Sequence, residues 1–144
     1  MFQLEFQFAV PDLLFHEELI DLGAYSRQDL LGFGLRVESL DAEGLETAIV
    51  YQSERPALSL VDSFALAIAD RQGWPLLTED RTMRSVAQSK GIVHRDALWV
   101  VDSMLDAGIL STPQVVAVLE AMRDDPRCPV PRPELALRLR QLNV

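Results

Sequence analysis

The segment that decides the fold is LSLVDSFALAIADRQGWPLLTED, residues 58–80. Its first part, residues 58–71, is an Ala-rich apolar stretch that begins with small and acidic side chains, and this pattern predicts a helix. Residues 75–78 are a short apolar run, which predicts a strand. Asp62 therefore lies at the start of the helix, and Asp80 follows the end of the strand. A helix and a strand in this order could bring both carboxylates to one edge of a sheet.

Two carboxylates at one sheet edge indicate a site for a divalent cation. Mg²⁺ and Mn²⁺ prefer oxygen ligands, and Mg²⁺ often takes one or two protein carboxylates together with phosphates and water. The pattern therefore points to phosphodiester chemistry. Each acid also has a simpler interpretation, because Asp62 would interact favourably with the helix dipole and Asp80 can cap the next helix. The two roles can coexist.

The size and charge of the chain limit the classes of function. The 144 residues fit one domain, and a domain of this length buries roughly 70% of its unfolded surface without disulfides. The formal net charge of −9 argues against broad, nonspecific nucleic-acid binding, which depends on Lys and Arg. Any RNA contact must be local, and the cationic residues that follow the second acid are Arg81, Arg84, Lys90 and Arg95.

The sequence also predicts a soluble, cytoplasmic protein without a membrane contact. Its apolar stretches are broken well short of the ~18 residues that a membrane-spanning helix needs. The N-terminus lacks the pattern of a signal peptide, and the lone Cys128 cannot form an internal disulfide.

Helices and strands are expected to alternate along the first two thirds of the chain. The expected strands are 5–10, 35–38, 75–78 and 92–94, and the expected helices are 11–22, 27–31, 41–52, 58–71 and 81–90. Alternation of this kind predicts a parallel sheet covered on both faces, with ligands near the carboxyl ends of the strands. Only helices are expected afterwards, at 97–107, 112–123 and 133–142. We therefore predict an α/β domain over 1–96 and a helical C-terminal extension over 97–144 that packs on the same domain.

These segments together resemble bacterial PIN-domain proteins, a family that includes the ribonuclease toxins of toxin–antitoxin pairs. Three segments carry the resemblance: FAVPDLLFHEEL at 8–19, LVD at 60–62 and LTED at 77–80. Two later segments, 97–102 and 107–110, resemble the helical extension of a subgroup of PIN-like proteins. The resemblance covers most of the chain.

The resemblance implies a three-layer α/β/α sandwich whose acidic residues hold Mg²⁺ or Mn²⁺ for the hydrolysis of RNA. Glu18 matches the acid on the family's first helix, Asp62 the acid at a later helix start, and Asp80 the acid after the Thr-containing strand. These three residues would be the catalytic and metal-binding acids. Thr78 matches a hydroxyl that supports the site. Because Glu18 lies beside Glu17, a solvated helix face explains either acid about as well.

Asp96 is an additional candidate acid that comes from the order of elements. It follows the strand expected at 92–94, at the same end of the sheet as Asp80. It could therefore contribute a compensating carboxylate. The simpler interpretation is an N-cap for the helix that begins at Ala97.

The chain departs from the family pattern at its start. Family members usually open with a strand that ends in Asp followed by Thr, Ser or Ala, and the residues before Phe8 do not supply one. We expect either that the natural start lies upstream of Met1 or that the protein has lost its first metal ligand and a central strand. A missing inner strand leaves unpaired backbone groups and an open apolar groove. We expect a second copy to cover this edge, which predicts a homodimer.

The expected function is that of a metal-dependent endoribonuclease acting on RNA, as the toxin of a pair with a protein antitoxin. With three acids in place of four, its affinity for metal should be reduced. The alternative is a catalytically degenerate or truncated PIN-like protein that serves as a binding module, with its helical tail docking a partner or a second copy. A DNA-binding, antitoxin-like protein is disfavoured because the chain has no basic recognition helix.

Overall fold

The chain forms two compact units. The computed structural model describes residues 1–17 and 26–142. The α/β unit comprises Phe2 and Leu4–Arg95, and the helical unit comprises Asp96–Val144 with Met1 and Gln3. Glu18 and the remainder of the helix that we expected to reach Leu22 lie outside the described residues. No helix in the described part of the chain is long and apolar enough to cross a membrane.

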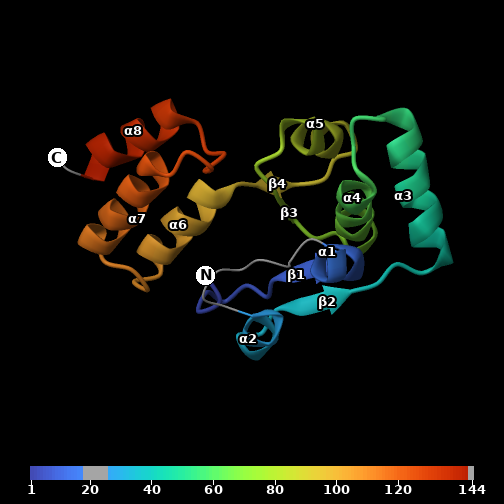
Figure 1. Cartoon of the computed structure of the whole chain (residues 1–144), viewed down its shortest axis with the longest axis horizontal. Coiled ribbons are helices and arrows are strands. Elements are labelled where there is room, and N and C mark those ends of the chain that lie inside the picture. Colours follow the sequence, from blue (N-terminus) through green and yellow to red (C-terminus); the bar gives the residue numbers. More distant parts are fainter. Residues whose placement is uncertain (18–25, 143–144) are drawn as a thin grey trace. The chain divides into compact units, whose positions relative to one another are not determined.

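Helices and strands alternate in the α/β unit, as the sequence predicts (Figure 1). Its elements in chain order are β1 (Ala9–Pro11), α1 (Asp12–Glu17), α2 (Arg27–Gly32), β2 (Arg36–Glu38), α3 (Ala42–Glu54), α4 (Leu60–Gln72), β3 (Leu76–Leu77), α5 (Arg81–Ser89) and β4 (His94–Arg95). The α/β fold class is thereby confirmed. The strands are shorter than the apolar runs that predicted them.

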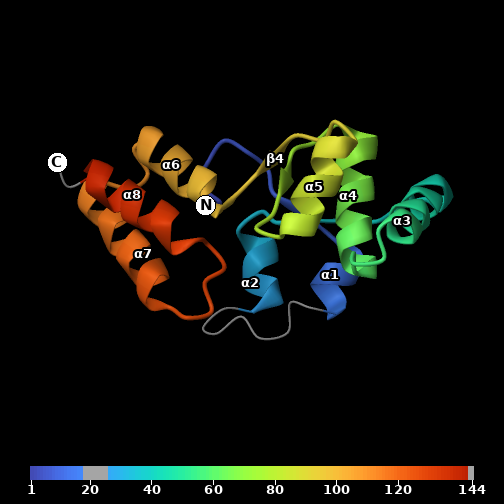
Figure 2. The ribbon, with the colours of Figure 1, turned by 90° about the horizontal axis from the view of Figure 1, so that it is seen from above.

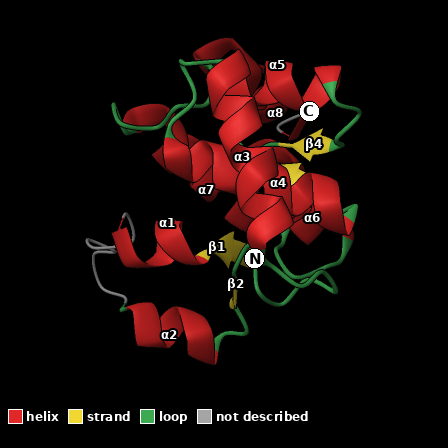
Figure 3. Cartoon of the chain, turned by 90° about the vertical axis from the view of Figure 1, so that its right-hand side faces the viewer, coloured by secondary structure: helices red, strands yellow, loops and turns green. Residues whose placement is uncertain are grey.

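The four strands pair in parallel but form two separate sheets, which Figure 3 draws as separate groups in yellow. In the first sheet Val10 is opposite Val37, and in the second Leu76 is opposite His94. The expected parallel pairing is present, whereas the expected single sheet is divided in the described residues. Helix α4 packs against both β1 and β3, so the same helix covers a strand of each pair.

Helix α4 is the central element of the α/β unit. The Ser59 hydroxyl caps it by accepting a hydrogen bond from the backbone N–H of Asp62 at 3.0 Å. Gly73 ends it in the left-handed conformation with φ of 69°. Leu66 and Ala67 are fully buried, and α3 packs along the helix. Small alanine side chains allow this close approach of helices, which explains the Ala-rich segment.

The core of the α/β unit joins α3, α4, β3 and α5. Its buried side chains are Ala48, Tyr51, Leu58, Leu66, Ala67, Ala69, Leu76, Met83, Val86, Ala87 and Ile92. Helix α5 contributes one apolar face, with Met83, Val86 and Ala87 spaced as on one side of a helix. The core therefore fixes the end of β3 and the start of α5, where Asp80 lies.

The helical unit consists of α6 (Ala97–Asp106), α7 (Thr112–Asp124) and α8 (Arg132–Leu142). Helices α7 and α8 lie side by side (Figure 2). The unit has its own core, formed by Leu98, Val101, Val115, Leu119, Val130, Leu135 and Leu139. The guanidinium of Arg132 donates hydrogen bonds to the carbonyls of Met122 and Asp125 at 2.8 and 2.7 Å, which holds the proline-rich connection against the end of α7.

Candidate functional site

Asp62 lies in the first turn of α4 and takes part in its cap. One of its carboxylate oxygens, Oδ2, accepts a hydrogen bond from the backbone N–H of Ser59 at 3.2 Å. Together with the Ser59 hydroxyl this forms a capping box. The side chain is partly exposed. A carboxylate has more acceptor positions than this one bond uses, so Asp62 can cap the helix and still bind a cation.

Thr78 and Asp80 form a hydrogen-bonded turn at the end of β3. The backbone N–H of Thr78 donates to the carbonyl of Arg95 at 2.9 Å, which attaches the turn to β4. The Thr78 hydroxyl accepts from the N–H of Asp80 at 3.0 Å, and Asp80 Oδ1 accepts from the N–H of Met83 at 2.9 Å. Asp80 is thus the N-cap of α5, as expected, and Thr78 holds its backbone in place.

The segment between Asp62 and Asp80 runs through α4, the turn at Gly73 and β3. From Asp62 to the end of α4 the helix rises about 15 Å. After the turn at Gly73 the extended chain to Asp80 spans up to about 23 Å. Helix α4, which carries Asp62, packs against β3 and α5, the two elements on either side of Asp80.

The other two acids of the predicted site are Glu18 and Asp96. Glu18 lies outside the described residues. Asp96 belongs to the helical unit, where it caps α6 by accepting a hydrogen bond from the N–H of Trp99 at 2.9 Å. Residues 1–17 and 26–142 contain no group of three or more His, Cys, Asp or Glu side chains that could hold a metal ion. Asp62 and Asp80 offer carboxylate oxygens, the donor type that Mg²⁺ and Mn²⁺ prefer.

Charged neighbours of the Thr78–Asp80 turn are partly neutralised. Glu79 forms an ion pair with Arg84 at 2.9 Å, and Lys90, at the other end of α5, forms one with Glu54 at 3.0 Å. Arg81 and Arg95 are exposed and have no ion pair within the described residues. Arg81 directly follows Asp80, and Arg95 is opposite Leu77 in the β3–β4 pair. Two cations therefore flank the turn.

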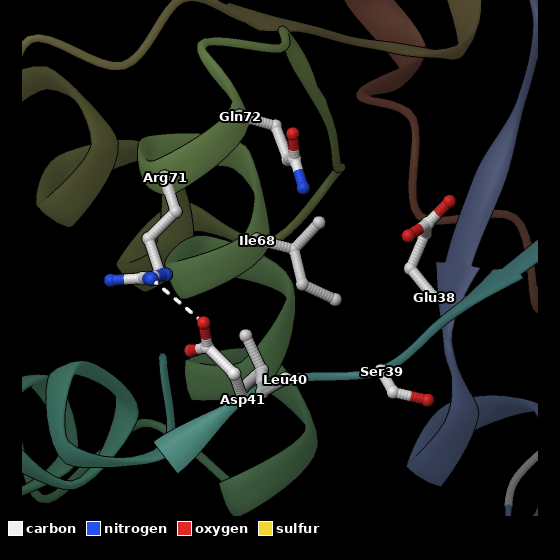
Figure 4. Close-up of a pocket in the computed structure, with 7 residues that line it drawn as sticks. All are labelled: Glu38, Ser39, Leu40, Asp41, Ile68, Arg71 and Gln72. Carbon is white, nitrogen blue, oxygen red and sulfur yellow. Dashed lines mark hydrogen bonds and ion pairs between the residues drawn. The ribbon is translucent and has the colours of Figure 1, made fainter. Parts of the chain in front are cut away.

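A small pocket of about 180 Å³ lies at the C-terminal end of α4, away from Asp62 (Figure 4). Its lining residues are Glu38, Ser39, Leu40, Asp41, Ile68, Arg71 and Gln72. The sequence did not point to this pocket, since its walls come from segments far apart in the chain. The charges in its wall already pair within the protein, because Arg71 lies 3.1 Å from Asp41 and Arg36 lies 2.9 Å from Glu38. We assign it no ligand.

Comparison with known proteins assigns the chain to a family. No curated protein and no solved structure matches the chain significantly. The family model DUF3368: PIN domain matches residues 1–143, a range that spans both units. PIN domains have a nuclease-like fold and generally bind divalent metals. The match extends over almost the entire sequence, and the chain therefore belongs to the PIN-domain family.

Proposed function

We propose that the protein is a metal-dependent endoribonuclease of the PIN type. The observation that carries this proposal is the turn at the end of β3, in which Thr78 braces Asp80 beside the first helical turn of α5. Family membership supports the proposal, because the fold is nuclease-like. The packing of α4, which carries Asp62, against β3 and α5, which flank Asp80, supports it further.

The proposed site residues have distinct roles. Asp62 and Asp80 would hold Mg²⁺ or Mn²⁺ through carboxylate oxygens, and Glu18 would complete the acidic set. Asp96 is an additional candidate acid. A bound metal ion of this kind polarises a phosphate oxygen and lowers the pKa of a coordinated water. Thr78 would position Asp80 through the hydrogen bond to its backbone, because outer contacts orient metal-binding side chains.

The substrate we propose is single-stranded RNA, bound through a few local cations. Arg81 and Arg95 are suited to this contact, since both guanidinium groups are exposed and flank the Thr78–Asp80 turn. Arginine binds phosphate oxygens with two parallel hydrogen bonds. The net charge of −9 would disfavour RNA contacts elsewhere on the protein.

In the cell we propose a cytoplasmic toxin that pairs with a protein antitoxin. We further propose that it forms a homodimer in which a second copy covers an open strand edge. The β1–β2 and β3–β4 pairs each present edges without a neighbouring strand in the described residues, and such edges favour pairing with another chain. A light-scattering mass of one protomer at micromolar concentration would contradict the dimer.

The nuclease proposal is tested by cleavage of single-stranded RNA during a titration with Mn²⁺ or Mg²⁺. The informative variants are Asp62→Asn and Asp80→Asn, because Asn accepts the same capping hydrogen bonds but lacks the charge that a cation needs. We expect either change to reduce cleavage by at least about 100-fold, since loss of even an outer contact to a metal costs about 10- to 100-fold.

Asp41→Asn is the matched control for these variants. Asp41 caps α3 through Oδ1, which accepts from the N–H of Gly44 at 2.7 Å, so the same chemical change is made at another helix start. This variant should cleave RNA as the natural chain does. Metal-independent cleavage, or equal activity in all four proteins, would contradict the proposed site. Metal binding and cleavage both absent from the natural chain would instead identify a degenerate PIN-like binding module.

A further inference from the structure

Glu79 lies between Thr78 and Asp80 and forms an ion pair with the helix that Asp80 caps. Its Oε2 lies 2.9 Å from Nη2 of Arg84 in α5. The two side chains are only 18% and 33% exposed. Partly buried pairs of this kind are screened by salt less than exposed pairs. The middle residue of the turn is thereby attached to α5.

The first turn of α5 also holds Asp80. The backbone N–H of Arg84 donates a hydrogen bond to the Asp80 carbonyl at 3.1 Å, and the N–H of Met83 donates to Asp80 Oδ1 at 2.9 Å. Asp80 is exposed, and its Oδ2 accepts no hydrogen bond within residues 1–17 and 26–142. This second oxygen is therefore available to a cation, and its position depends on how firmly the turn is held.

We propose that Arg84 is a positioning residue of the metal site. This inference rests on the proposed function, because Arg84 has this role only if Asp80 binds a cation. The pair with Glu79 restrains the backbone next to Asp80 and so sets the direction in which the Asp80 carboxylate leaves the turn. Arg84 itself would not touch the metal ion.

Charge and position predict opposite effects for the loss of Arg84. Removal of a positive charge beside an acidic site strengthens the attraction of a metal ion, and it would also release Glu79 as a possible ligand. Loss of an outer contact that orients a metal-binding side chain weakens metal binding, typically by about 10- to 100-fold. The direction of the change in affinity therefore separates a positioning role from general electrostatics and from direct binding by Glu79.

Isothermal titration calorimetry of the full chain with Mn²⁺ measures this change. Arg84→Gln should weaken Mn²⁺ binding about tenfold. Arg84→Lys keeps the charge and should bind more tightly than Arg84→Gln. The matched control is Arg71→Gln, because the Arg71 side chain is 32% exposed and pairs with Asp41 at 3.1 Å. This control should bind Mn²⁺ at least as tightly as the natural chain, and circular dichroism should show unchanged folding in all three variants.

A second comparison tests whether Arg84 acts through Glu79. In a chain that already carries Glu79→Gln, the further change Arg84→Gln should have no effect on the affinity for Mn²⁺, because the ion pair is already lost. An additional tenfold loss there would overturn the proposal. Unchanged or tighter Mn²⁺ binding by Arg84→Gln alone would also overturn it, and so would equal weakening in Arg84→Lys.

Asp80→Asn separates failure of this inference from failure of the proposed function. If Asp80→Asn weakens Mn²⁺ binding and Arg84→Gln does not, the positioning role is wrong and the metal site stands. If Asp80→Asn binds Mn²⁺ as the natural chain does, or the natural chain binds none, the proposed metal site is wrong and the positioning role fails with it.

Discussion

Tyr51 links three helices of the α/β unit through its ring and its hydroxyl. The hydroxyl donates to Asp70, and the Lys90 ammonium lies 5.3 Å from the centre of the ring. Lys90, the lysine at the end of α5, also pairs with Glu54. Burial is the main cause that raises the pKa of Tyr51 above its usual value of 10.0, and the hydrogen bond to Asp70 acts in the same direction. The phenol therefore stays protonated in the folded protein.

Tyr51→Phe should reduce the free energy of unfolding by about 1 kcal/mol at pH 7, the usual contribution of one hydrogen bond. The loss should shrink above pH 10. There the unfolded phenol ionises while the folded phenol does not, so alkaline pH removes the stabilisation from the natural chain only. Urea unfolding at pH 7 and pH 11 measures both effects. An unchanged difference between the two proteins at both pH values would contradict the role of Tyr51.

At the scale of elements, the turn between α4 and β3 decides where Asp80 lies. Gly73 adopts φ of 69°, and its N–H donates to the carbonyl of Ala69. Side chains other than glycine are strained in this conformation. The turn ends α4 and leads into β3, which packs against α4.

Gly73→Ala should therefore reduce the free energy of unfolding by about 1 kcal/mol. No atom lies within 4 Å of a Cβ added at this position, so the loss would come from backbone strain and not from a clash. Gly32→Ala is the control, because a Cβ there also meets nothing within 4 Å and its φ is not positive. Thermal unfolding of both variants measures the difference. A loss of the same size at Gly32 would show that strain at Gly73 is not the cause.

The sequence predicts the elements better than their association. Helix starts were predictable because Asp41, Asp80 and Asp96 all cap helices through hydrogen bonds to residues three positions later. The division of the strands into two pairs was not predictable, because pairing joins residues such as Val10 and Val37 that are far apart in the chain. Strands of two or three residues also leave too short a pattern to mark their ends.

In the candidate site, too, local features were predictable from the sequence and contacts between distant segments were not. Thr78 and Asp80 lie in one short segment, so the hydrogen bond between them is local, and their role in a metal site stays a prediction. The pocket at Arg71 and the contact between Tyr51 and Asp70 were not found, because each joins segments that only the fold brings together.

At the scale of the whole molecule, the net charge of −9 and the proposed metal site both favour the binding of cations. A cation that binds the folded chain, but not the unfolded chain, stabilises it by about 2.7 kcal/mol at a concentration 100 times its dissociation constant. An acidic protein also attracts cations without a specific site. Binding of metal by the natural chain alone therefore does not demonstrate a specific site. A specific site requires that binding depends on particular carboxylates.

The most direct test of a metal site formed by Asp62 and Asp80 is a Mn²⁺ titration followed by electron paramagnetic resonance, which measures the free ions. The natural chain and Asp41→Asn should bind Mn²⁺ with the same affinity, whereas Asp62→Asn and Asp80→Asn should each bind at least about tenfold more weakly. Asp41 tests general attraction, because its replacement removes one negative charge just as the other two variants do. Equal Mn²⁺ binding in all four proteins, or none in the natural chain, would contradict a metal site formed by Asp62 and Asp80.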